Sequence, residues 1–101
     1  TEFEFTMAKV NAVSGATDQE FSALTKSAED LGRSTFFTAE QVAQLQLNFS
    51  KLGFTSNEIL AAQEATLNLA TATGSDLARA ATVAGASVRG FGLSQMKLLE
   101  L

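Results

Sequence analysis

Apolar side chains recur along most of this chain every three to four residues, the spacing that places them on one face of an α-helix. Only the first segment is ambiguous. Phe3, Phe5 and Met7 alternate as in a strand, whereas Phe3, Met7 and Val10 fit a helix. We expect a helix there, because no second strand is present to pair with it. The later series are Phe21, Leu24, Ala28 and Leu31; Val42, Leu45, Phe49 and Leu52; Ile59, Leu60, Gln63, Leu67 and Ala70; and Leu77, Ala81, Ala84, Val88 and Phe91.

Capping boxes predict where three of these helices begin. In such a box a Thr is followed three residues later by Glu or Gln, and each side chain bonds the backbone N–H of the other residue. Apolar residues also flank each box at the positions of a hydrophobic staple. The boxes are Thr17–Glu20, Thr38–Gln41 and Thr55–Glu58, with staples Ala16/Phe21, Phe37/Val42 and Phe54/Ile59; Leu93/Leu98 around Ser94 fits a fourth start, although Lys97 breaks its box.

Four glycines, each at the end of a periodic stretch, predict where helices stop. Glycine readily adopts the left-handed conformation that ends many helices. The four are Gly32, Gly53, Gly74 and Gly92. In the Schellman form of this ending, Phe54 should contact Phe49 and Leu93 should contact Val88.

The stretch at residues 52–55, Leu-Gly-Phe-Thr, is echoed at 91–94, Phe-Gly-Leu-Ser. Reuse of the same turn chemistry is the simpler interpretation, and a true repeat is the alternative.

Together these signals predict an all-α fold, a compact bundle of about five short helices joined by glycine-stop and Thr/Ser-cap turns. The 101 residues are enough for one small core, so we expect a single helical domain over residues 1–101. The chain opens at Thr1 without an initiator Met or a signal pattern, and we expect it to be a piece of a longer protein. The last residues, 99–101, could be native or a cloning remnant.

Two helices carry features that suggest a contact surface. The helix expected over 38–52 has Ala43 and Leu47 on a different side from its main stripe, so it is either central in the bundle or in contact with another subunit. The helix expected over 75–91 is rich in small residues, which permit a neighbour to approach closely. We therefore take Ala43, Leu47, Ala81 and Gly85 as a candidate interface and expect a homo-oligomer.

Composition removes most kinds of chemistry. The chain has no His and no Cys, which excludes the usual general base, thiol chemistry and zinc-finger sites. Its net charge of −4 and the absence of a basic run disfavour direct nucleic-acid binding. No apolar stretch approaches the length of a membrane span. We expect no cofactor, metal, small-molecule substrate or catalytic residue.

The remaining candidate motifs have structural explanations. The acidic pairs, Glu2/Glu4 and Glu29/Asp30, are better explained as solvated helix faces than as catalytic carboxylates. Residues 85–90 have the glycine spacing of a phosphate loop, but Phe91 stands where the lysine should be. Asn48 begins a glycosylation triplet that lies inside an expected helix. We interpret the eight Phe as core anchors.

A series of short sequence blocks runs through most of the chain. The blocks are residues 7–17; Leu31-Gly32 with Thr35, Phe37, Thr38 and Ala39; 52–54; 67–70; 74–78; and 91–93. In this order and spacing, over roughly residues 7–94, the chain resembles the core region of phage tail tape measure proteins. The specificity lies in the whole series rather than in any one block. Two departures are Gln63-Glu64, where the family often has a proline, and Thr82, where it often has an acid.

This resemblance implies a structural protein of a phage or prophage tail, whose length sets the length of the tail. It implies location in the virion tail, with assembly in the bacterial cytoplasm, and partners among tail tube and tail assembly proteins as well as other copies of itself. Two alternatives remain open from the residues alone. One is a stand-alone helical adaptor or regulatory domain, and the other, less favoured without His and Cys, is a carboxylate-dependent hydrolase.

Overall fold

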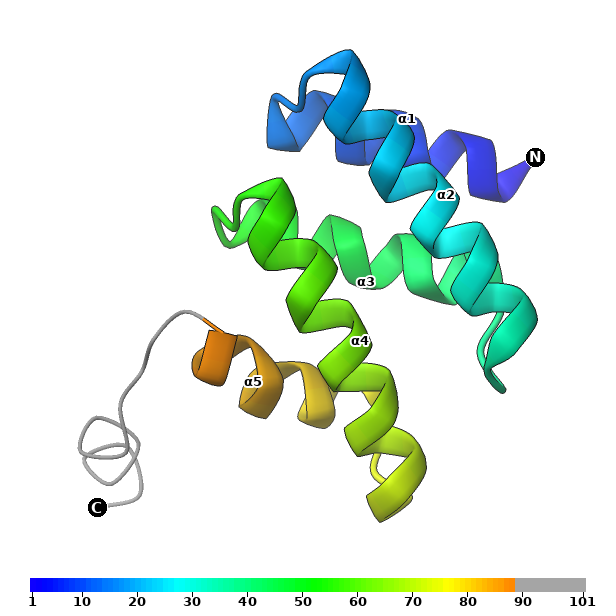
Figure 1. Ribbon diagram of the computed structural model, residues 1–101, viewed down its shortest axis with the longest axis vertical. Helices are drawn as coiled ribbons and strands as arrows, with labels where there is room; N and C mark the ends of the chain where they lie inside the picture. Colours follow the sequence, from blue (N-terminus) through cyan, green and yellow to red (C-terminus); the bar gives the residue numbers. More distant parts are fainter. Residues whose placement is uncertain (89–101) are drawn as a thin grey trace.

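A computed structural model describes residues 1–88 as five helices (Figure 1). Helices make up 83% of these residues and none of them lies in a strand, which confirms the all-α fold and the helical choice for the first segment. The expected stop at Gly92 and the start around Leu93, Ser94 and Leu98 lie outside the described residues. The helices are α1 Glu2–Ser14, α2 Asp18–Ser34, α3 Ala39–Lys51, α4 Ser56–Thr73 and α5 Leu77–Val88.

All three expected capping boxes are present. At α2, α3 and α4 the cap Thr Oγ1 accepts the backbone N–H three residues on, over 3.0–3.2 Å. The Glu or Gln at that position accepts the backbone N–H of the Thr over 2.8–2.9 Å. A fourth box, Thr1–Glu4, begins α1 and was not identified from the sequence. The start of α5 is capped without such a box, because the third position is Arg79 rather than Glu or Gln. Asp76 Oδ1 accepts the Arg79 backbone N–H at 2.8 Å.

Gly53 and Gly74 have positive φ angles, 86° and 71°, which confirms the left-handed endings expected there. At Gly53 the ending is a Schellman motif. Its N–H donates to the Ser50 carbonyl at 3.0 Å, and the Phe54 N–H donates to the Phe49 carbonyl at 3.1 Å. The Phe49 and Phe54 rings stack with centroids 4.9 Å apart, which is the expected contact. Gly15, with φ 65°, ends α1 in the same conformation and was overlooked.

Gly32 does not end a helix, so that prediction is wrong. It lies inside α2, which continues to Ser34 and ends at the extended residue Thr35. A Cβ built on Gly32 would lie 2.6 Å from the backbone nitrogen of Ala39 and 2.9 Å from its Cα. The glycine is therefore required by the close approach of the start of α3, not by a left-handed turn.

Each helix reverses the direction of the one before it (Figure 1). α1, α3 and α5 run the same way across the molecule, and α2 and α4 return in front of them. α3 is central, because it packs against all four other helices. The radius of gyration is 13.4 Å and the extents are 42 × 28 × 17 Å, in agreement with the compact bundle expected.

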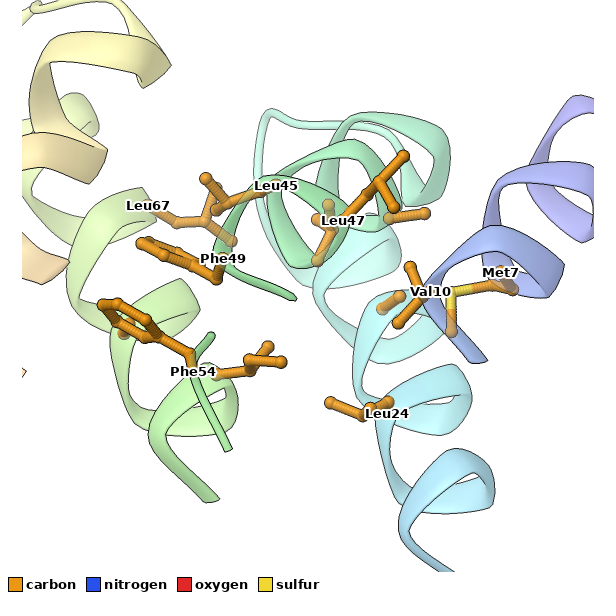
Figure 2. Close-up of a cluster of buried hydrophobic side chains, with 13 residues drawn as sticks. Met7, Val10, Leu24, Leu45, Leu47, Phe49, Phe54 and Leu67 are labelled. Atoms are coloured by element: carbon orange, nitrogen blue, oxygen red, sulfur yellow. The ribbon is translucent and has the colours of Figure 1, made fainter. Parts of the chain in front are cut away.

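The buried side chains form one cluster that extends from α1 to α4. Figure 2 shows Met7 and Val10 of α1 pointing toward Leu47 and Leu24, while Phe49 and Phe54 face one another beyond them. Leu52 departs from its expected series, because it follows the last turn of α3 and is 67% exposed. The view of every Phe as a core anchor also fails, since Phe36 is 91% exposed.

A buried polar contact joins the three middle helices. The Gln46 side-chain amide of α3 donates to the Leu24 carbonyl of α2 at 2.9 Å and to Gln63 Oε1 of α4 at 2.8 Å. Gln63 in turn donates to the Ser27 hydroxyl. Because both glutamines are almost fully buried, these bonds fix how α2, α3 and α4 lie against one another.

Candidate interaction surface

Ala43 and Leu47, two of the candidate interface residues, are buried inside the chain. Their exposed fractions are 0% and 4%, and α1 lies over them. Thr6 of α1 donates to Glu40 at 2.5 Å, and Gln44 donates to Thr6 at 3.3 Å. Glu40 and Gln44 lie on the side of α3 that carries Ala43 and Leu47. Of the two alternatives drawn from the sequence, the central position of the helix is therefore the one observed.

Gly85 is buried as well. A Cβ built there would lie 3.0 Å from Phe49 Cε1 and 3.3 Å from Phe54 Cζ. The small residue does permit the close approach expected of it, but the neighbour is the stacked aromatic pair of the same chain. Ala81 is half-buried and faces a groove. The four candidate residues thus do not form one exposed surface.

The groove that includes Ala81 lies between α3 and α5, which touch only at a few residues. It has a volume of about 290 Å³ and a mixed lining from both helices: Glu40, Gln41, Gln44, Leu45, Asn48, Leu77, Ala78 and Ala81. A second hollow, of about 440 Å³, lies between the end of α2 and the second half of α4. Its lining is Arg33, Ser34, Thr35, Phe36, Asn68, Thr71 and Ala72.

Large apolar side chains reach solvent on α1 and α5, the first and last helices described. On α1, Phe5 is 57% exposed and Val13 is 47% exposed, and on α5 Val83 is 45% exposed. Lys9 places its ammonium group 4.4 Å from the centre of the Phe5 ring, a cation–π contact that partly covers it. These residues lie outside the helical apolar series of the sequence, so periodicity alone does not single them out.

The acidic side chains support structural contacts. Asp30 forms an exposed ion pair with Arg33, at 2.5 Å. The pKa of Glu20 is lowered, first by the hydrogen bond from the Thr17 backbone N–H and then by the Ser56 hydroxyl. Ser56 donates to Glu20 at 2.9 Å, so this carboxylate caps α2 and also joins it to the start of α4.

Among residues 1–88 no three His, Cys, Asp or Glu side chains gather as a metal site would require. In the same part of the chain, no helix combines the length and apolar character of a membrane span. What the described geometry offers is helical faces, grooves and exposed apolar side chains, which are features of protein–protein contact.

Comparison with known proteins agrees with the resemblance noted from the sequence. Residues 25–100 match the family described as phage-related minor tail protein. A tape measure protein of Pneumococcus phage Dp-1 is 39% identical over 92 residues, which are 91% of this chain and 8% of that relative. The chain thus spans a small part of the relative's length. No solved structure matches. With three quarters of its residues matched by the family model, the chain belongs to the family of phage-related minor tail proteins.

Proposed function

We propose that this chain is a structural segment of a phage or prophage tail tape measure protein. It contributes to tail assembly and to tail-length determination through contacts made by its helices. The observation that carries the proposal is the 39% identity to a tape measure protein over nearly the whole chain. Its partners are other copies of itself and the tail tube and tail assembly proteins. It is made in the bacterial cytoplasm and ends in the virion tail.

The proposed role is non-enzymatic. The polar side chains that make long-range contacts, among them Gln46, Gln63, Thr6 and Glu20, all join one helix to another. This use of polar groups supports a structural role, in which the folded chain offers a surface for contact with other proteins.

Within the tape measure the segment acts as a compact docking domain, and the measuring length lies mainly in other parts of the parent protein. A continuous helix of 101 residues would extend about 150 Å at 1.5 Å per residue. The longest dimension of this fold is 42 Å. Its frequent caps and left-handed glycines support a folded unit rather than a ruler.

A pair of phage variants tests the structural role. Leu47→Gln introduces a polar group beneath α1 and should unfold part of the segment, which we expect to lower the yield of complete tails. Leu52→Gln makes the same change at an exposed position of the same helix end and is the matched control. Electron microscopy and plaque counts measure the outcome. Normal tails and infectivity with Leu47→Gln would contradict the proposal and favour an adaptor without a tail role.

An in-frame duplication of residues 39–76 tests the docking role against the ruler. Adding 38 residues of continuous helix would lengthen the tail by about 57 Å. As a compact domain, the duplicated segment should leave the mean tail length unchanged within about 20 Å, since packed helices add little length. Tail lengths measured on micrographs decide between them. A full increment would make this segment part of the ruler.

A further inference from the structure

Among residues 1–88, Phe36 is the large apolar residue most exposed to solvent. It lies in the turn between α2 and α3, and its exposed fraction is 91%. The next residue, Phe37, is partly buried against the core and directly precedes the cap of α3. The described fold thus uses Phe37 and leaves Phe36 without a part in its packing.

The turn that carries Phe36 is held in place from both sides. The Thr35 backbone N–H and hydroxyl both donate to the Leu31 carbonyl, at 3.0 and 2.6 Å. The Phe37 N–H donates to the Thr35 hydroxyl at 3.1 Å, and the capping box of Thr38 follows at once. Because the backbone around Phe36 is already fixed, a partner that binds this side chain has little chain ordering to bring about.

Phe36 stands at the hollow of about 440 Å³ between the end of α2 and the second half of α4. The remaining lining comes from residues 33–35, 68, 71 and 72, whose neighbours along the chain are all described. Figure 1 shows α5 on one side of α4 and the end of α2 on the other. The hollow therefore belongs to the middle of the fold and not to its first or last helix.

Arg33 is the only charged residue in the lining of this hollow. Its guanidinium pairs with Asp30, but both side chains are largely exposed, 72% and 50%, and such surface pairs contribute little stability. Arg33 also has further N–H donors, which suit the two oxygens of a carboxylate. The hollow thus favours a negatively charged group beside the Phe36 ring.

The other polar side chains of the lining are available for contact. Ser34, Asn68 and Thr71 form no side-chain hydrogen bond with another residue of the described part of the chain. Each can donate to or accept from a partner that displaces water from the hollow. They supply the neutral polar surroundings that an interface places around its anchor residues.

This combination is typical of contact between separately folded proteins. Aromatic residues and Arg are enriched in such interfaces and often supply most of the binding energy. Permanent contacts are more apolar and resemble a domain core, whereas Phe36 is the single large apolar residue of this lining. One cation is too few for a nucleic acid, and the exposed lining does not enclose a small molecule as ligand pockets do.

We propose that Phe36 and the adjoining hollow dock a second, separately folded tail protein. That protein presents an acidic segment: its apolar side chains cover the Phe36 ring, and its carboxylate pairs with Arg33. Phe36 is the anchor of the contact, and Arg33 selects the charge of the partner. This docking site deepens the contact with tail proteins given in the proposed function, and it rests on that function for its biological setting.

Photocross-linking in assembling phage tests the docking site. The photoreactive phenylalanine analogue that carries a benzophenone group replaces Phe36 in the full-length protein. In the control it replaces Leu52, an exposed apolar residue of the next turn. We expect Phe36 replacement alone to give a cross-link to another tail protein, and mass spectrometry of the joined peptides should locate it beside an Asp or Glu.

Two substitutions in α2 then test the role of charge. Arg33→Gln should lower the yield of this cross-link severalfold, because it removes the pair with the partner's carboxylate. Lys26→Gln makes the same change of charge on the same helix outside this hollow and should leave the yield unchanged. In the purified chain, Phe36→Ser should keep the native melting temperature, since a residue that serves only docking does not stabilise the fold.

The docking site would be overturned by a cross-link to the parent protein itself, by equal cross-linking from Leu52, or by no cross-link at all. A yield that Arg33→Gln leaves unchanged, or a lower melting temperature of Phe36→Ser, would also contradict it. These failures are distinguishable from failure of the proposed function. If Leu47→Gln lowers the yield of tails and Phe36 replacement gives no cross-link, the tail role stands and only the docking site is lost.

Discussion

Gly32 and Gly53 both lie near the ends of helices, but the fold needs a glycine at each for a different reason. At Gly53 the reason is conformational, since φ is 86°. At Gly32 it is steric, since a side chain would meet the backbone of Ala39. Substitutions at the two positions therefore report on different physical quantities.

Gly53→Val should lower the free energy of unfolding by about 1 kcal/mol or more, because a β-branched residue is strained in the left-handed region. Gly53→Asn should cost less, since Asn tolerates this conformation better than other residues. Thermal or urea denaturation of the two variants measures the difference. Equal stability of the native chain and the Val variant would contradict the left-handed turn.

Gly32→Ala should also destabilise the fold, by about 1–3 kcal/mol, because the new methyl group overlaps backbone atoms that cannot rotate away. Alanine in an open helix position would instead stabilise by up to about 1 kcal/mol. Gly85→Ala is the matched comparison, because its methyl group would meet the movable rings of Phe49 and Phe54. We expect Gly32→Ala to be the costlier change, and the reverse order would sink the steric explanation.

These glycines mark the limit of what sequence could tell about single residues. A glycine near the end of a helical pattern predicts a stop, and this was right for Gly53 and Gly74. The same pattern was misleading at Gly32, because close approach by a later helix leaves no local signal. Gly15 carries the right signal, two residues before the box at Thr17, as Gly53 does before Thr55.

Among the helices, Gln46 and Gln63 provide the polar link between α2, α3 and α4. Gln46→Leu should cost about 1–3 kcal/mol, because it leaves the buried Gln63 Oε1 without this donor and removes the side-chain bond to the Leu24 carbonyl. Adding Gln63→Leu should recover part of that loss, since the pair would then be apolar on both sides. A double-mutant cycle from denaturant unfolding gives the coupling, and additive losses would contradict a shared bond.

Glu20 makes the link between α2 and α4 sensitive to acid. Its pKa is lowered in the folded state, so its contribution to stability is present above the unfolded pKa, near 4.5, and is lost as pH falls through the lower folded value. Glu20→Gln keeps a capping side chain, as Gln41 does in α3, but removes the titration. The difference in melting temperature between native and variant should therefore shrink from pH 6 to pH 3.

Glu29→Gln removes one exposed carboxylate from the same helix and controls for the change in net charge. A Glu20 difference that stays constant over this pH range would contradict the hydrogen-bonded carboxylate.

At the level of helices, sequence was a good guide to starts and periods, because capping boxes and apolar spacing are local. It was a poor guide to which faces of α3 meet which neighbours. Ala43 and Leu47 form a second apolar side whether α1 of the same chain or another subunit covers them. Only the folded path of α1 decides this, and that path depends on contacts 34 residues apart, such as Thr6 with Glu40.

For the whole molecule, small-angle scattering at low concentration should give a radius of gyration close to 13.4 Å. The physical reason is that successive helices reverse direction and pack on α3, which keeps the chain short. A rod approaching about 150 Å would contradict the compact bundle.

The repeated turns were visible in sequence only as the echo between residues 52–55 and 91–94, which we interpreted as reused turn chemistry. Turn chemistry recurs in unrelated helices, so that interpretation was the simpler one. The buried positions of α2 and α4 agree only in part, since Ser56 and Leu67 are buried where Asp18 and Glu29, 38 residues earlier, are exposed. Reused turn chemistry therefore remains the simpler interpretation.

The order of the helices also bears on how this chain folds as it is made. Helices here pack mainly against neighbours one or two helices away in sequence, and such local topologies fold on the microsecond-to-millisecond scale. Ribosomes add roughly 5–20 residues per second, so two helices of about 38 residues in all emerge over roughly two to eight seconds. Each new helix therefore has time to settle on those already made before the next one appears, and apolar faces are exposed mainly on the newest helix.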